Sequence, residues 1–307
     1  MTATIAPRRL RGSPQRRRNE SLVRAVLFAA AGLSVLISAG IVLSLIFEAV
    51  TFITSIDLSQ LFADGWFPRR GMFSVPTVLA GTLIITIIAM IIAAPIGLFS
   101  AIYLAEYASP RVRRVVKPTL EILAGIPSVV LGFFALTWIS PNVVRSIFPG
   151  ANGFSLLAAG LGVGILTIPL VASISEDAMR AVPISLREAS YGLGARRMTT
   201  SMRVVVPAAI SGIVAAMILA FSRAIGETMI VAIAAGASGG SLFTLNPLGP
   251  GQTLTAAMAS LATGSDNVTG NSAAFLSLYF LGLVLFVMTL GLNLVGDVFV
   301  RRTRQKY

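Results

Sequence analysis

Six long stretches of apolar residues restrict what this chain can fold into more than any other feature of its sequence. A helix needs roughly 20 mainly apolar residues to cross the hydrocarbon core of a bilayer. Charged residues are 12% of the 307 residues, whereas hydrophobic residues are 55%. A soluble domain carries about 25% charged residues. The sequence therefore predicts an all-α polytopic protein with six transmembrane helices, at residues 25–50, 77–105, 119–139, 155–175, 204–235 and 273–300.

The 24 lysines and arginines alternate from loop to loop, and this alternation predicts the orientation of the chain. Twenty lie on one side of the predicted spans, three lie in loops on the other side, and Arg223 lies inside a span. Basic loops stay in the cytoplasm, so we expect both termini to be cytoplasmic. The basic side consists of an arginine-rich arm at 1–24, the loops 107–118 and 176–203, and the tail 301–307, which flank a transmembrane domain at 25–300.

Missing residue types exclude several kinds of chemistry. The chain has no cysteine and no histidine, so disulfides, thiol catalysis and Cys/His metal sites are excluded. Its only lysines, Lys117 and Lys306, follow no glycine-rich phosphate loop. We therefore expect a non-enzymatic subunit without a cofactor or metal, with any ATP and Mg²⁺ on a partner chain. The net charge of +12 is spread over loops, which favours contact with anionic lipid over nucleic acid.

The basic loop 176–203 has the sequence of a short helix with defined ends. Pro183 suits the beginning of a helix, and Ser185 and Glu188 stand three residues apart, as in a capping box. Gly194 suits the left-handed position that ends a helix. The sequence therefore predicts one short helix between these signals.

The same segment carries an apolar face. Leu186, Ala189 and Leu193 follow a spacing that places them on one side of a helix. A helix this short is not stable alone in water. It is therefore either a docking helix, which the combination of cap, apolar face and terminal glycine favours, or only an elbow between two spans.

These residues carry a family resemblance. Glu188-Ala189-Ser190 is followed by Gly194 six residues after the glutamate and by Pro207 nineteen residues after it. This run resembles the EAA motif of ABC importer permeases, from which it departs only in having Ser190 for the second alanine. The resemblance implies that Leu186–Arg197 is a coupling helix, which fits a groove of a cytoplasmic ATPase subunit.

Three further stretches are similar to phosphate-specific permeases, and more to their PstC branch than to the PstA branch. They are residues 101–107, 123–134 and 222–229, and the resemblance extends through nearly all of 70–300. It implies a type I importer permease fold and transport of phosphate. It also implies four kinds of partner: a homologous PstA-type permease, a dimer of PstB-type ATPase subunits, an extracytoplasmic PstS-type phosphate-binding protein and the lipid bilayer.

Two charged residues lie near the middle of the predicted fifth span. Arg223 and Glu227 are four residues apart, which would place both on one face of a continuous helix. A charge at that depth costs about 2.5–3.5 kcal/mol and therefore points to a function or a paired structure. An arginine offers donors that match phosphate oxygens. The residues alone leave a transport role and a structural ion pair open, and the resemblance implies a role in phosphate passage.

Other stretches give further expectations. Gly125-Ile126-Pro127-Ser128 is expected to break or kink the third span, either as a packing kink or to present free N–H groups to anions. Asn246–Thr253 is a candidate contact for the binding protein. Trp66 is expected to anchor at the membrane interface, and Glu106, near a span end, to reach into water.

Rival interpretations remain open at this level. One is a different transport subunit, either the PstA-type sister or an ABC importer permease for sulfate, molybdate or phosphonate. The other is a membrane phosphate sensor or scaffold that keeps the permease fold. An intact EAA-like loop argues against the second, because it retains the features of ATPase coupling.

Overall fold

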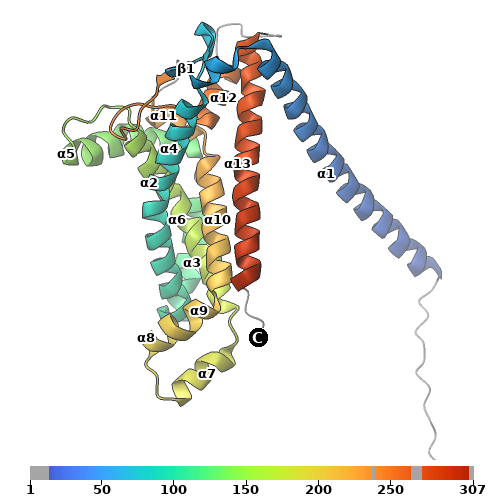
Figure 1. The fold of residues 1–307 in the computed structure, drawn as a ribbon. Coiled ribbons are helices and arrows are strands. Elements are labelled where there is room, and N and C mark those ends of the chain that lie inside the picture. Colours follow the sequence, from blue (N-terminus) through green and yellow to red (C-terminus); the bar gives the residue numbers. More distant parts are fainter. Residues whose placement is uncertain (1–13, 237–238, 264–271, 304–307) are drawn as a thin grey trace, which may run out of the picture. The chain divides into compact units, whose positions relative to one another are not determined.

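The chain folds into a helical protein with one small sheet (Figure 1). The computed structural model describes residues 14–236, 239–263 and 272–303. Its helices are α1 (Pro14–Ser55), α2 (Val75–Ile102), α3 (Pro110–Ala124), α4 (Ser128–Phe134), α5 (Arg145–Ile147), α6 (Leu156–Arg180), α7 (Ile184–Gly192), α8 (Arg197–Thr200), α9 (Val206–Ala208), α10 (Ile210–Ile225), α11 (Met229–Ala234), α12 (Leu254–Thr263) and α13 (Ala273–Thr303). Strands β1 (Gly65–Phe67), β2 (Met72–Phe73) and β3 (Ser241–Leu242) form the sheet.

Short segments of other helical types connect these elements. Wider π-helical turns are η3 (Tyr103–Tyr107), η4 (Ala135–Val144) and η5 (Ser201–Val205), and tighter 3₁₀ turns are η1 (Leu58–Phe62) and η2 (Pro68–Arg70). A π turn in a helix often marks a functional position. Of these π turns, η5 lies within the EAA-like motif, between Gly194 and Pro207, and η3 continues α2.

The prediction of an all-α polytopic membrane protein is confirmed. Among the described residues, five helices are long and apolar enough to cross a membrane, and a bent pair, Arg197–Ala208 with Ile210–Ile225, would be a sixth span. The five are Asn19–Ser55, Val75–Tyr107, Ser128–Ile147, Leu156–Arg180 and Ala273–Arg302. The helix α1 already begins at Pro14, so part of the arginine-rich arm is helical, whereas residues 1–13 and 304–307 lie outside the described residues.

The predicted third span, 119–139, is placed differently in the structure. The helix α3 ends at Ala124, and the apolar helix that can span begins at Ser128. Between them the chain turns at Gly125-Ile126-Pro127, so the predicted break is present. The physical reason is that proline disfavours helical geometry in the residue before it. The residues before the break therefore form a separate helix, α3, with charged residues on one side.

The predicted fifth span, 204–235, is also not one continuous helix. The chain bends by 69° between α9 and α10, just after Pro207, which lacks an N–H for the helix ladder. A second interruption lies at Gly226–Thr228, between α10 and α11. The predicted span is therefore divided at two places, and its charged pair falls at the second interruption.

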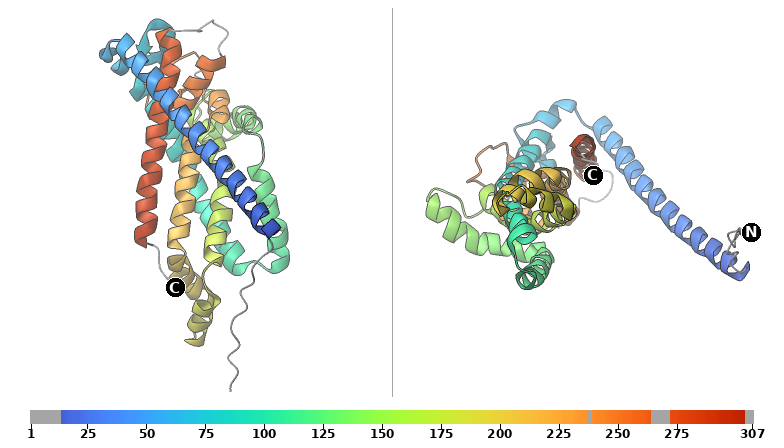
Figure 2. Two further views of the ribbon diagram at one scale, coloured as in Figure 1. Left: turned by 90° about the vertical axis from the view of Figure 1, so that its right-hand side faces the viewer. Right: turned by 90° about the horizontal axis from the view of Figure 1, so that it is seen from below.

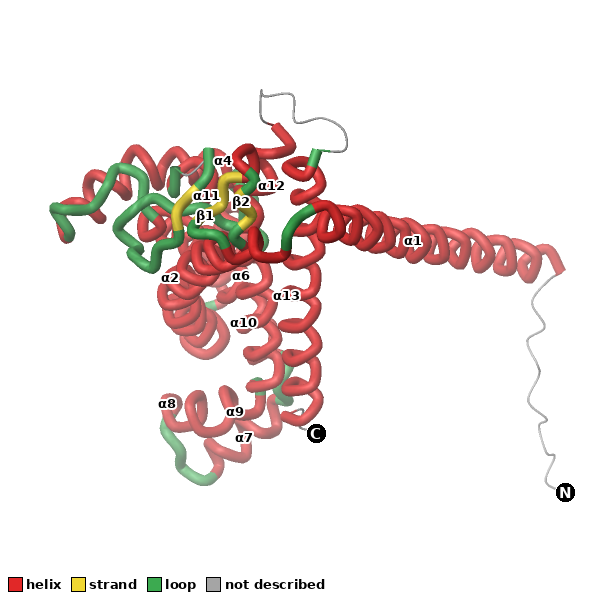
Figure 3. The backbone as a smooth tube through the Cα atoms, turned by 45° about the horizontal axis from the view of Figure 1, so that its top comes forward, coloured by secondary structure: helices red, strands yellow, loops and turns green. Residues whose placement is uncertain are grey.

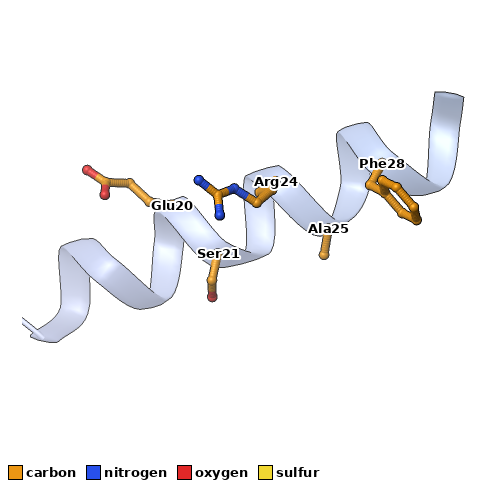
Figure 4. Close-up of a pocket in the computed structure, with 5 residues that line it drawn as sticks. All are labelled: Glu20, Ser21, Arg24, Ala25 and Phe28. Carbon is orange, nitrogen blue, oxygen red and sulfur yellow. The ribbon is translucent and has the colours of Figure 1, made fainter.

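Residues 14–47 form one unit and are described by themselves. They are helical throughout, and large apolar side chains such as Leu27, Phe28 and Leu36 are exposed on this helix. A helix with apolar side chains all round is suited to lipid. A hollow of about 440 Å³ along it is lined by five residues from two turns of α1 alone (Figure 4). It is open helix surface and not a closed site.

The second unit, residues 48–303, is built around α2 and α6. Small residues let these helices approach closely. A Cβ added at Gly97 would lie 2.6 Å from the Cβ of Val171, and one at Gly160 would lie 2.7 Å from the Cγ2 of Ile88. The helices α10 and α13 pack side by side next to this pair (Figure 2). Close packing of α2 on α6 therefore forms the rigid centre of this unit.

The two ends of the second unit differ, as Figure 3 shows. One end, here called the sheet end, carries the antiparallel sheet in the order β2-β1-β3. Trp66 is 1% exposed there and packs edge-on against Phe73, so the expectation that it anchors at the membrane interface was wrong. The opposite end, here called the coupling end, carries α7, α8 and α9.

Candidate functional site: the coupling end and the broken fifth helix

The helix α7 begins without the predicted capping box. Its N-cap is Pro183, with no side-chain cap hydrogen bond, and Ser185 lies inside the helix. The reason is local, because the fixed φ of proline already suits a helix and starts the helix one residue ahead of Ser185. Glu188 is consequently an exposed side chain in the middle of α7.

The predicted end of this helix is confirmed at Gly194. This residue has φ +77°, a left-handed conformation that strains any residue with a Cβ. Its N–H donates to the carbonyl of Tyr191 at 2.9 Å, and the N–H of Ala195 donates to the carbonyl of Ser190 at 3.1 Å. These two bonds form a Schellman motif, which satisfies the last carbonyls of α7.

The apolar face of α7 is only partly as predicted. Leu186 packs on a cluster that includes Met179 and Val182 of the α6 end. Ala189 is exposed, and Leu193 lies after the helix and is 90% exposed. The predicted common face of these residues is therefore wrong, because the helix ends before Leu193. Exposed apolar side chains project outward instead, from Ile184, Tyr191 and Leu193.

The motif residues divide into three positions. Glu188, Ala189 and Gly194 are exposed at the tip of the coupling end. The hydroxyl of Ser190 lies 2.9 Å from that of Thr200, which joins α7 to α8. Pro207 lies in α9, next to the bend before α10. The motif thus combines an open surface, a link within the loop and a bend at the base of a span.

An ion pair that the sequence analysis missed joins the motif to α2. Arg187 donates to the Glu106 carboxylate through Nη2 at 2.9 Å and Nε at 3.3 Å. The side chain of Glu106 is only 3% exposed. The expectation that Glu106 reaches into water was wrong, because the half-buried Arg187 takes the place of water. No spacing rule links two residues 81 positions apart.

Arg197 contacts the same segment from the other side of the loop. Its guanidinium lies 5.1 Å from the centre of the Tyr107 ring, an arrangement typical of a cation–π contact. It also donates a hydrogen bond to the carbonyl of Glu106. The η3 turn is therefore held by side chains from α7 and from α8.

A second buried carboxylate lies at the end of α6. Glu176 is fully buried. Its Oε1 lies 2.7 Å from Arg113 Nη2 in an ion pair, and its Oε2 accepts Lys117 Nζ at 2.8 Å, both partners coming from α3. Lys117 also pairs with Asp177. Burial lowers the pKa of Lys117, but the hydrogen bonds to Asp177 and Glu176 and their negative charge outweigh burial, so its pKa is raised above 10.5. This cluster ties α3 to α6.

The structure separates the two charged residues of the fifth span. The helix α10 ends at Ile225 with Gly226 as its C-cap, so Arg223 lies in the last turn and Glu227 lies beyond the helix. The prediction that one helical face carries both was wrong, because the helix stops between them. Arg223 is exposed, and between these two described residues there is no ion pair.

Glu227 instead stabilises the start of the next helix. Its Oε1 accepts the N–H of Thr228 at 3.2 Å and that of Ile230 at 3.5 Å, which satisfies free donors at the beginning of α11. Its own carbonyl accepts the hydroxyl of Thr255 from α12 at 2.8 Å. Arg223 is therefore left as an open cation beside a well-fixed turn.

Apolar spans and an exposed short helix at one end define an integral membrane protein. Known proteins agree with this class. A family model described as binding-protein-dependent transport system inner membrane component matches residues 93–306. The chain belongs to this family of ABC importer permeases.

Relatives cover most of the chain. A probable ABC transporter permease of Bacillus subtilis, YqgH, is 35% identical over 240 residues, which are 78% of this chain and 74% of that protein. The phosphate transport system permease PstC of Mesorhizobium japonicum is 32% identical over 288 residues, which are 88% and 86% of the two chains. The similarity to PstC-type permeases expected from the sequence is thereby confirmed.

Solved structures share the fold. A bacterial ABC transporter involved in import of the polysaccharide alginate has a TM-score of 0.64 at 15% identity, covering 94% of this chain and 100% of the other. The MetNI methionine ABC transporter has a TM-score of 0.53 at 21% identity, covering 74% and 92%. At these identities the likeness concerns the arrangement of helices.

Proposed function

We propose that this chain is the transmembrane permease subunit of an ATP-driven bacterial importer of inorganic phosphate. The observation that carries the proposal is the 32% identity with the phosphate transport permease PstC over 88% of this chain. The exposed α7 with the EAA-like motif supports coupling to an ATPase. The chain would be a multi-pass protein of the plasma membrane with both termini in the cytoplasm, consistent with its basic loops.

The proposed transporter has four other parts. A homologous PstA-type permease would complete the translocation pathway, and two PstB-type ATPase subunits would bind ATP and Mg²⁺. A PstS-type binding protein would deliver phosphate from outside, with Asn246–Thr253 near the sheet end as a candidate contact. This chain itself would carry no cofactor or metal and would bind no nucleic acid.

The proposed ATPase surface is the exposed part of the coupling end. Glu188, Ala189 and Gly194 are open there, beside the exposed side chains of Tyr191 and Leu193. An exposed apolar patch of this kind commonly marks a protein interface. When ATP closes the ATPase dimer, movement of this surface would be passed to the spans as a rigid-body change.

The proposed phosphate contact is Arg223. Its side chain is exposed at the end of α10 and is not neutralised by Glu227. A planar guanidinium can donate two parallel hydrogen bonds to phosphate oxygens. Glu227 would shape the pathway by holding the turn at the start of α11 and would repel anions that approach too closely.

The test is phosphate uptake in bacteria whose own phosphate importer is deleted. The cells express this chain with the subunits encoded beside its gene, and sulfate is added as the competing anion. Uptake that sulfate does not reduce is the expected result. Failure to restore uptake in spite of normal membrane levels would overturn phosphate as the substrate, and strong competition by sulfate would indicate a different anion.

A PstA-type position in the same transporter is the second candidate. The permease PstA 1 of Mycobacterium tuberculosis is 38% identical over 176 residues, which cover 57% of this chain and 55% of that protein. Complementation separates the two candidates. The chain should replace a deleted PstC-type subunit and not a deleted PstA-type subunit.

A further inference from the structure

We propose that Arg187 and Glu106 form a positioning pair that makes α7 and the end of α2 move as one body, so that ATPase movement reaches the transmembrane helices. This proposal rests on the proposed function. It assigns a role to two residues outside the three-residue motif core and outside the phosphate contact.

Arg187 holds three chain segments at once. Besides Glu106, it donates from Nη1 to the carbonyl of Val182 at 2.7 Å and from Nη2 to the carbonyl of Met179 at 2.9 Å. The guanidinium therefore joins α7, the end of α6 and the end of α2. Its planar fork can serve these acceptors together, which a single ammonium group of lysine cannot do with the same geometry.

Other attachments of α7 are weaker. The helix buries none of its residues. Its remaining links are the half-buried Leu186 and the contact between the hydroxyls of Ser190 and Thr200. A nine-residue helix with so little buried surface would swing on its loops under load. The side chain of Arg187, 17% exposed against the 3% exposed Glu106, is its most buried charged link.

The recipient of this link is suited to carry movement onward. Glu106 lies in η3, which continues α2 without a break, and Arg197 from α8 also holds η3. The helix α2 packs along α6 and reaches the sheet end, where the Thr82 hydroxyl accepts the N–H of Leu254 at 3.0 Å. A displacement of α7 is therefore passed through η3 to the length of α2.

The functional test compares transport with ATP hydrolysis in the purified complex in liposomes. Arg187→Gln is expected to keep the ATPase subunits bound and ATP hydrolysis active, while phosphate moved per ATP falls about tenfold, within the usual range for loss of an allosteric coupling. The phosphate moved per ATP by Arg187→Lys should lie between the values for wild type and for Arg187→Gln. The control is Arg114→Gln on α3, an exposed arginine for which the described residues show no ion pair, and it should behave as wild type.

A structural readout keeps the test independent of phosphate. The chain has no native cysteine, so Ser185→Cys on α7 and Tyr103→Cys in η3 give one pair of spin labels when the partner subunits are also cysteine-free. In the assembled complex the distance between the labels should be narrowly distributed and unchanged by ATP. In Arg187→Gln the distribution of the distance between the labels should broaden. The double variant Arg187→Gln with Glu106→Gln leaves no unpaired buried charge and should show the same broadening if the single variant does not fold.

Three results would overturn the proposal. The first is an unaltered ratio of phosphate to ATP in Arg187→Gln, and the second is a label distance that remains narrow in the double variant. Loss of uptake and hydrolysis in parallel with loss of the ATPase subunits would also overturn it, because Arg187 would then serve docking. If wild type moves no phosphate but the label distances behave as expected, the substrate is wrong and the positioning pair stands.

Discussion

Arg223 and Glu227 lie on opposite sides of Gly226, the residue that ends α10, and each has different surroundings. Arg223 is exposed, whereas Glu227 holds two backbone N–H groups of the turn that begins α11. The helix break thus separates an open positive charge from a negative charge with a structural task. The two residues should consequently respond differently to substitution.

Replacing Arg223 should affect transport and leave assembly intact. Arg223→Gln is expected to lower phosphate uptake by about tenfold or more, the size of one lost charged hydrogen bond, and Arg223→Lys should retain part of the activity because it keeps the charge but not the fork. Uptake at matched membrane abundance is the measurement. Arg301→Gln, which affects only an exposed pair with Asp297, is the control. Normal uptake by Arg223→Gln would remove this residue from the pathway.

Glu227 should act through its oxygen atoms on helix stability. Glu227→Gln keeps an acceptor for the N–H groups of Thr228 and Ile230, whereas Glu227→Ala removes it and should cost about 1 kcal/mol, as for a lost helix cap. The thermal unfolding temperature of the purified complex should therefore be lower for Glu227→Ala and unchanged for Glu227→Gln. Equal unfolding temperatures for both variants would show that the cap contributes little.

The left-handed glycine after α7 gives a matched pair of variants. Gly194→Ala should cost about 1–2 kcal/mol, because a Cβ is strained at φ +77°. Gly192 lies within α7, and a Cβ added there would meet no atom within 4 Å. Gly192→Ala should therefore stabilise the helix. Amide hydrogen exchange over residues 184–195 should be faster in the first variant and slower in the second. The same exchange in both would contradict the Schellman end of α7.

Close packing of α2 on α6 predicts where small residues are required. Gly97→Ala places a Cβ 2.6 Å from Val171 and should destabilise the protein by about 1–3 kcal/mol through overpacking. Gly291→Ala on α13 meets no atom within 4 Å and should not lower the melting temperature. Thermal unfolding in detergent is the measurement, and tolerance of Gly97→Ala equal to that of Gly291→Ala would refute the close approach.

The part of the link between α3 and α6 that Lys117 makes should weaken at high pH. The pKa of Lys117 is raised above 10.5 in the folded protein, so its contribution is complete below 10.5 and is lost as pH rises through the folded value. A spin label at Thr119→Cys on α3 should become more mobile only in that alkaline range. Lys117→Arg remains charged there and should keep the label immobile. Equal mobility in both proteins would assign the change to other groups.

The sequence by itself determined the class of protein, a multi-span membrane protein, and the places where particular helices end or break. Apolar stretches longer than a bilayer crossing require spans, since the backbone must bond internally in lipid. Gly194 and Pro127 act through their own backbone geometry, so the end of α7 and the break before α4 were predictable from local residues. The spacing of Glu188, Gly194 and Pro207 likewise indicates an importer permease, because a motif within one loop depends on no distant contact.

Only the tertiary structure decided which charges meet. Glu106 is near the end of a span in sequence, but it is buried because Arg187, 81 residues later, is folded against it. Trp66 is a core residue for the same reason, because Phe73 and its neighbours cover it. Local sequence sets where a backbone can turn, whereas burial and ion pairing depend on distant segments that only folding brings together.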